Sequence, residues 1–149
     1  MLLRALLAFL LLPGIVAIAV PVIWLDAAGH DHVASVWGFP LLLAGGAGLL
    51  WCVRDFFSSG KGTLAPWDPP RQLVSVGLYR YSRNPMYVCV TLILLGWAFT
   101  FGEPGLLIYA ACVAVAFELR VVFGEEPWLT RTHGDAWRQY AARVPRWLW

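Results

Sequence analysis

Charged side chains are scarce in this chain of 149 residues, in which Asp, Glu, Lys and Arg make up 13% and hydrophobic residues 60%. Soluble domains carry about 25% charged residues. The uncharged stretches are also continuous, because Ala5–Leu25, Val33–Val53 and Asn84–Gly102 contain none of these four residue types. Each stretch is long enough to cross a hydrocarbon core of ~30 Å as a helix. The composition therefore argues against a soluble enzyme and predicts an integral membrane protein.

A fourth apolar run, Pro104–Phe117, is followed by Glu118 and Arg120 before further apolar residues. We interpret it as a fourth span with charges near one end. The sequence thus predicts an all-α, polytopic membrane protein whose helices lie at about 5–25, 33–53, 85–102 and 104–123. Because these spans leave too little chain for a second core, residues 1–149 are predicted to form one transmembrane domain.

Cysteine is also rare, and its positions indicate neither a metal site nor a disulfide framework. Cys52, Cys89 and Cys112 all lie in apolar runs and lack the spacing of metal ligands. Two histidines in the 26–32 loop form an H-x-H pattern, which alone is a weak metal signal. We therefore predict no metal centre.

Lysine and arginine are absent from two predicted connections, Asp26–His32 and Gly102–Pro104. The opposite connections and the ends hold all of them, at positions 4, 54, 61, 71, 80, 83, 120, 131, 138, 143 and 146. The positive-inside rule therefore predicts that both termini and the central loop are cytoplasmic. The polar residues gather in two blocks on that side, 54–84 and 118–149, and blocks of this size indicate a built site.

Small residues are expected to bring the helices close together. Span two contains Ala44, Gly45, Gly46 and Gly48, which predict a small-residue face for helix packing. Spans three and four are separated by little more than Gly102–Pro104, so they are expected to form a tight antiparallel hairpin.

The segment Gly77–Tyr87 concentrates rings, donors and acceptors directly before the third span. One interpretation is an interfacial anchor, in which Arg80 and Arg83 bind lipid phosphates and Pro85 starts the helix. That interpretation explains each residue type separately but not their density. The alternative is a binding site at the end of the span.

Carboxylates follow the fourth span at Glu118, Glu125 and Glu126. Glu118 and Glu125 are seven residues apart and share a face if the helix continues through Gly124. Acidic groups at a membrane boundary are functional candidates. They are equally compatible with a helix end that is neutralised by neighbours such as Arg120.

The order of these motifs resembles the isoprenylcysteine carboxyl methyltransferase and phospholipid methyltransferase superfamily. The resemblance runs from residue 66 to residue 146 and rests on Pro66–Pro70, Leu73, Val74, Gly77–Tyr87, Glu125, Glu126, Tyr140 and Val144–Arg146. It implies packed transmembrane helices with a cytoplasmic pocket for S-adenosylmethionine. By this resemblance the cofactor-binding residues are Tyr79, Arg83, Asn84, Tyr87, Glu125 and Glu126, and the catalytic residues are Glu125 and Arg131, with Arg131 facing the acceptor.

These residue types suit that cofactor. Carboxylates pair with an ammonium or accept from ribose hydroxyls, Arg binds a carboxylate, and aromatic rings stack on adenine. No G-x-G-x-x-G pattern follows a strand, so a Rossmann cofactor domain is not expected. Methyl transfer mainly requires alignment and exclusion of water. An amine or thiol acceptor must also lose a proton, to Glu125, Glu126 or His133, whereas a carboxylate needs no base.

We therefore predict an S-adenosylmethionine-dependent membrane methyltransferase. Its partners are the lipid bilayer and a lipophilic or membrane-associated acceptor that carries a carboxylate, amine or thiol, and no nucleic acid is expected. The alternative from another class is a small proton-coupled transporter that uses Glu118. A scaffold is a third reading, but it leaves the Gly77–Tyr87 segment unexplained.

Overall fold

The computed structural model of the protein describes residues 10–30, 32–59 and 73–148, and the structural statements below concern these ranges. Within them the chain forms helices and no strand, which confirms the predicted all-α class. Two helices are long and apolar enough to cross a membrane, Val36–Phe56 and Pro104–Arg143, and Pro13–Ala27 and Pro85–Phe101 are shorter apolar helices. The number of four spans stays a prediction. Pro66–Pro70, Asp31 and residues 5–9 lie outside the described ranges.

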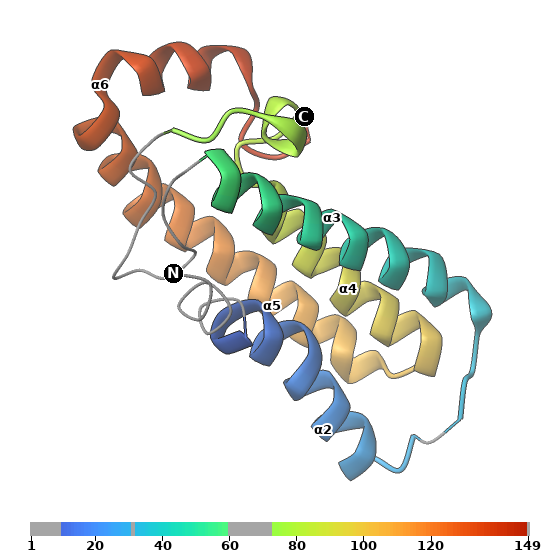
Figure 1. The fold of residues 1–149 in the computed structure, drawn as a ribbon. Helices are drawn as coiled ribbons and strands as arrows, with labels where there is room; N and C mark the ends of the chain where they lie inside the picture. Colours follow the sequence, from blue (N-terminus) through green and yellow to red (C-terminus); the bar gives the residue numbers. More distant parts are fainter. Residues whose placement is uncertain (1–9, 31, 60–72, 149) are drawn as a thin grey trace.

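Helix α4 (Pro85–Phe101) is the centre of the bundle and lies between α3 (Phe39–Ser59) and α5 (Pro104–Arg120) (Figure 1). It begins at Pro85, where a missing N–H loses no helical hydrogen bond. It ends at Gly102, which adopts a left-handed conformation with φ of 67°. The Glu103 carboxylate then accepts from the Gly105 N–H at 3.0 Å and caps α5. These signals produce the expected antiparallel hairpin.

Glycines bring α3 and α4 into backbone contact. A Cβ on Gly45 would lie 2.7 Å from the Cys89 carbonyl oxygen, and one on Gly48 would lie 2.6 Å from the Cys89 sulfur. These two glycines are three residues apart and share one face of α3. Gly46 lies elsewhere, because a Cβ there would meet nothing within 4 Å. The small-residue face is therefore narrower than the sequence suggested.

The first helix, η1 (Leu10–Ala19) continued by α2 (Val20–Ala27), packs on α4 and α5 through two of its backbone carbonyls. Pro21 lacks the N–H that would otherwise donate to the Ala17 carbonyl in the preceding turn. The Trp97 indole N–H instead donates to the Ala17 carbonyl at 2.9 Å, and the Tyr109 hydroxyl donates to the Val16 carbonyl at 3.2 Å. Side chains of the neighbouring helices thus satisfy this backbone.

The two connections without Lys or Arg meet at one end of the bundle. Backbone N–H groups of Ala34 and Ser35 donate to the Thr100 carbonyl at 2.9 and 3.1 Å. His30 Nε2 lies 3.2 Å from a Glu103 carboxylate oxygen. The segment Ser35–Gly38 then leads into α3 through the short 3₁₀ helix η2 (Val36–Gly38).

At the opposite end of the bundle, the helices extend beyond their predicted bounds. Helix α3 runs to Ser59, six residues beyond the expected 33–53 span, and it buries Asp55 to 8% exposure. Helix α5 does not stop near 123 but passes through a wide π-helical turn, η4 (Val121–Glu125), into α6 (Glu126–Arg143). Helix α6 bends at Gly134, whose φ is 52°. It folds over this end of the bundle beside the C-terminus (Figure 1).

Candidate active site

The C-terminal tail, which we define as Val144–Leu148, lies across the segment that precedes α4. The Arg83 N–H donates to the Pro145 carbonyl at 2.9 Å. The Ser82 hydroxyl and the Asn84 side-chain amide both donate to the Arg146 carbonyl, at 3.2 and 3.1 Å. Two motifs more than 60 residues apart are therefore joined through backbone atoms.

A second set of contacts anchors the end of α6. The Tyr140 hydroxyl donates to the Tyr79 carbonyl at 2.7 Å, and Tyr79 lies within the short 3₁₀ helix η3 (Gly77–Arg80). Burial raises the pKa of Tyr140 to about 12, although Arg83 opposes this shift. Burial also raises the pKa of Tyr79 well above its usual value. Both phenols are therefore neutral at physiological pH.

Glu126 lies at the centre of a charged cluster. Arg146 binds it through two parallel hydrogen bonds, Nε to Oε1 at 3.0 Å and Nη2 to Oε2 at 2.8 Å. Arg83 Nη1 approaches the same Oε1 at 2.9 Å, and the Arg83 guanidinium lies 5.6 Å from the centre of the Trp137 ring. Bidentate pairs of this kind are stronger than single contacts. The Glu126 hydrogen bond is the largest cause that raises the pKa of Arg146.

Glu118 joins the same cluster from the last turn of α5. Its Oε1 accepts from Arg146 Nη1 at 3.0 Å, and its Oε2 accepts from the Trp147 indole N–H at 2.7 Å. The carboxylate thus holds two neighbouring residues of the C-terminal tail. Nothing in these contacts supports the role in proton-coupled transport that the sequence left open.

Glu125 points to a different set of partners. Its Oε1 accepts from the Tyr87 hydroxyl and from Arg120 Nε, the latter at 2.8 Å. The Tyr87 ring stacks on Phe117 with 4.2 Å between ring centres. The wide turn η4 lies between Glu118 and Glu125. The helix does continue through Gly124, which was the condition for Glu118 and Glu125 to share a face. The two carboxylates nevertheless bind different partners.

The predicted site residues are therefore only partly brought together. Arg83, Asn84, Tyr87, Glu125 and Glu126 lie around the junction of α4, η4 and the C-terminal tail. The Tyr79 ring is buried at 6% exposure against Phe56, with 5.6 Å between ring centres, so in this arrangement it supports the site from the core.

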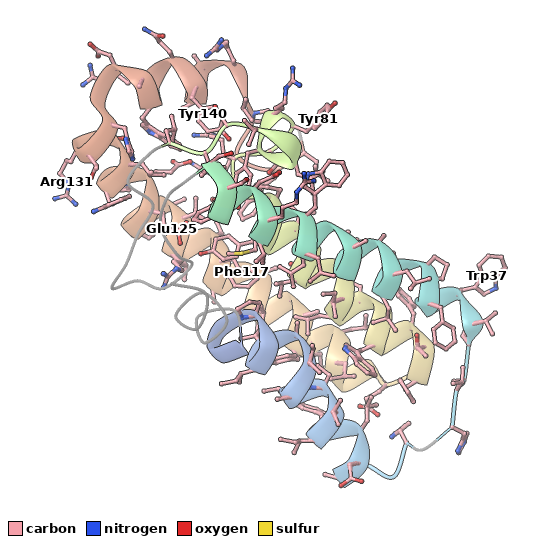
Figure 2. All side chains as sticks on the ribbon, in the orientation of Figure 1. Trp37, Tyr81, Phe117, Glu125, Arg131 and Tyr140 are labelled. Atoms are coloured by element: carbon pink, nitrogen blue, oxygen red, sulfur yellow. The ribbon has the colours of Figure 1, made fainter. Side chains whose placement is uncertain are left out.

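Arg131 is placed apart from the cluster. Its side chain is exposed on α6 and its Nε donates to the Pro127 carbonyl of the preceding turn at 3.2 Å. Figure 2 shows it at the outer edge of the bundle, away from the Glu125 side chain. A role for Arg131 therefore requires an acceptor that reaches the outer side of α6.

Sequence reasoning missed Arg146 as a site residue, and with it Arg120 and Trp147. Arg146 belongs to the Val144–Arg146 motif, one of those on which the resemblance rests, and that motif was the signal that could have identified it. The resemblance gave Arg146 no role. Its partners lie 20 and 28 residues earlier in the chain. No helical periodicity connects such positions across the bend at Gly134.

The cluster offers the chemistry that S-adenosylmethionine needs. Arg83 Nε is buried without a hydrogen-bond acceptor among the described residues, and the same holds for His133 Nε2. Glu125 retains a side-chain exposure of 33%, so its carboxylate is open to a ligand. Acidic, basic and aromatic groups are thus available for an ammonium, a carboxylate and a purine ring.

The comparisons with known proteins identify the family of the chain. A family model described as phospholipid methyltransferase matches residues 45–136, which extend from α3 into α6. The matched range contains the Gly77–Tyr87 segment and the Glu125–Glu126 pair. Neither the curated proteins nor the solved structures give a match. Since the family model covers more than half of the chain and confirms the resemblance, the protein belongs to the phospholipid methyltransferase family and is a methyltransferase by that membership.

Proposed function

We propose that this protein transfers a methyl group from S-adenosylmethionine to a lipophilic or membrane-associated acceptor. The observation that carries the proposal is the convergence of Arg83, Asn84, Tyr87, Glu125 and Glu126 at one end of the bundle. All five residues lie within the range that matches the methyltransferase family.

S-adenosylmethionine supplies, when bound, a methyl group activated by its sulfonium. Glu125 and Glu126 are the proposed partners of its ammonium and ribose hydroxyls. Arg83 would bind its carboxylate through the buried Nε that has no acceptor among the described residues. Tyr87 holds Glu125 by a hydrogen bond, and its stacking on Phe117 fixes the ring. The site residues are therefore oriented before any ligand arrives.

The role of the protein in the transfer itself is mainly positional. Methyl transfer is a displacement at carbon, and rate is gained by alignment and by exclusion of water. For an amine or thiol acceptor, Glu125 is the proposed base, because its carboxylate is partly exposed and has a hydrogen-bonded neighbour in Tyr87. Arg131 is the proposed contact on the acceptor side, at the exposed face of α6.

The membrane setting follows from the apolar helices. We propose four spans with both termini and the charged cluster on the cytoplasmic side, since the opposite connections contain no Lys or Arg. A water-soluble donor would then enter from the cytoplasm. A lipophilic acceptor would approach laterally from the bilayer, where α5 exposes Ile108, Val115 and Leu119.

Isothermal titration of the detergent-purified protein with S-adenosylhomocysteine tests the proposal. We expect saturable binding at micromolar strength that is lost in Glu125→Gln and in Glu126→Gln, because neither amide carries the negative charge of a proposed cofactor-binding carboxylate. Arg138→Gln is the matched control, since Arg138 pairs with the exposed Asp135, outside the cluster. A folded protein that binds no ligand, in detergent and again in lipid nanodiscs, would refute the proposal.

A further inference from the structure

The carboxylates proposed to bind the donor already hold a cation that belongs to the chain. Both oxygens of Glu126 accept from Arg146, and Glu118 accepts from the same guanidinium. This contact uses every nitrogen of the Arg146 side chain. A donor ammonium that binds Glu126 must therefore compete with Arg146.

The charges of the cluster are balanced as long as Arg146 stays in place. Three carboxylates, Glu118, Glu125 and Glu126, face three guanidinium groups, Arg83, Arg120 and Arg146. S-adenosylmethionine carries a sulfonium and an ammonium against one carboxylate, so its net charge is positive. A neutral cluster gives such a ligand little electrostatic attraction. With the Arg146 guanidinium displaced, one negative charge becomes available.

The backbone of the C-terminal tail does not depend on the Arg146 side chain. The tail is held by the Arg83 N–H on Pro145 and by Ser82 and Asn84 on the Arg146 carbonyl. Val144 is also buried, at 8% exposure. The Arg146 side chain is about a third exposed, so its guanidinium can move outward while the tail stays in place.

Resting on the proposed function, we propose that Arg146 is an internal competitor that occupies the ammonium subsite of the donor at Glu126. Its guanidinium neutralises and orders the acidic subsite. The donor ammonium binds Glu126 only after it displaces this side chain, so the strength of the Arg146–Glu126 ion pair sets the affinity of the site for the donor. A simple structural clamp has the opposite consequence, because its loss weakens ligand binding.

The test compares S-adenosylmethionine binding by the wild type, Arg146→Met and Arg143→Met in detergent. Methionine keeps an apolar stem and removes the charge. We expect Arg146→Met to bind about tenfold more tightly, which corresponds to about 1.4 kcal/mol, while its melting temperature without ligand is lower. Arg143 is exposed and donates to the Gln139 carbonyl, outside the cluster, so Arg143→Met should bind as the wild type does.

A second variant covers the case in which Arg146→Met does not fold. Arg146→Lys keeps the charge balance of the cluster but cannot form the two parallel hydrogen bonds to Glu126, so it should also tighten binding several-fold. Unchanged or weaker binding by a folded Arg146→Met or Arg146→Lys protein, beside a wild type that binds, overturns the inference alone. Absence of binding by the wild type and by both variants overturns the proposed function and the inference with it.

Discussion

Two neighbouring glycines of α3 give a controlled test of how closely the helices pack. Replacing Gly45 by alanine places a Cβ 2.7 Å from the Cys89 carbonyl oxygen and 2.7 Å from Ile93 Cγ1. Overpacking of this kind costs about 1–3 kcal/mol, because the helices must separate. The Gly46→Ala change adds a Cβ that meets nothing within 4 Å. Each change also stabilises α3 by about 1 kcal/mol, because alanine has a higher helix propensity than glycine. This contribution cancels when the free energies of unfolding of the two variants are compared.

We therefore expect Gly45→Ala to be less stable than Gly46→Ala by about 1–3 kcal/mol. At roughly 3 °C per kcal/mol for a chain of this size, the gap in melting temperature is roughly 3–9 °C. Circular dichroism during heating in one detergent measures it for the wild type and both variants. Equal melting temperatures for the two alanine variants would show that α3 and α4 do not approach as described.

The remaining predictions concern the far end of the bundle. Tyr140→Phe removes the hydrogen bond to the Tyr79 carbonyl and should lower the free energy of unfolding by about 1 kcal/mol. Because burial raises the folded pKa of Tyr140 to about 12, its contribution should be complete below pH ~10 and lost as the pH rises towards 12. An equally steep alkaline loss in Tyr140→Phe would contradict this. Arg131→Ala should leave S-adenosylhomocysteine affinity unchanged and lower turnover, and full turnover would remove Arg131 from the site.

The ends of α4 could be predicted because their signals are local. Pro85 starts the helix, and Gly102 ends it in the left-handed conformation that glycine tolerates. The sequence predicted that the fourth span ends near residue 123 and raised a helix through Gly124 only as a condition, because Glu118, Arg120 and the glutamate pair are typical of the end of an apolar run. Those charges remain on a helix because Arg146 and Arg120 neutralise them.

The location of the candidate residues at one end of the bundle was easier to predict than the ion pairs among them. The resemblance singled out Arg83, Glu125 and Glu126, and the structure places all three at one end of the bundle. That Glu126 is shared between Arg83 and Arg146 depends on how the tail returns across residues 82–84. Such pairing is set by tertiary packing, and neither spacing nor composition encodes it.

The wide turn at Val121–Glu125 has a consequence for how this chain tolerates changes in length. A π-helical turn accommodates one more residue than the α-helix on either side of it. Deleting a single residue there would let α5 and α6 join as one regular helix, which costs the backbone nothing. Because the residue removed is the extra one, the side chains after the turn would keep their orientation about the axis. A one-residue deletion at the turn would thus be tolerated, whereas the same deletion within the regular part of α5 would turn every later side chain by ~100° about the axis.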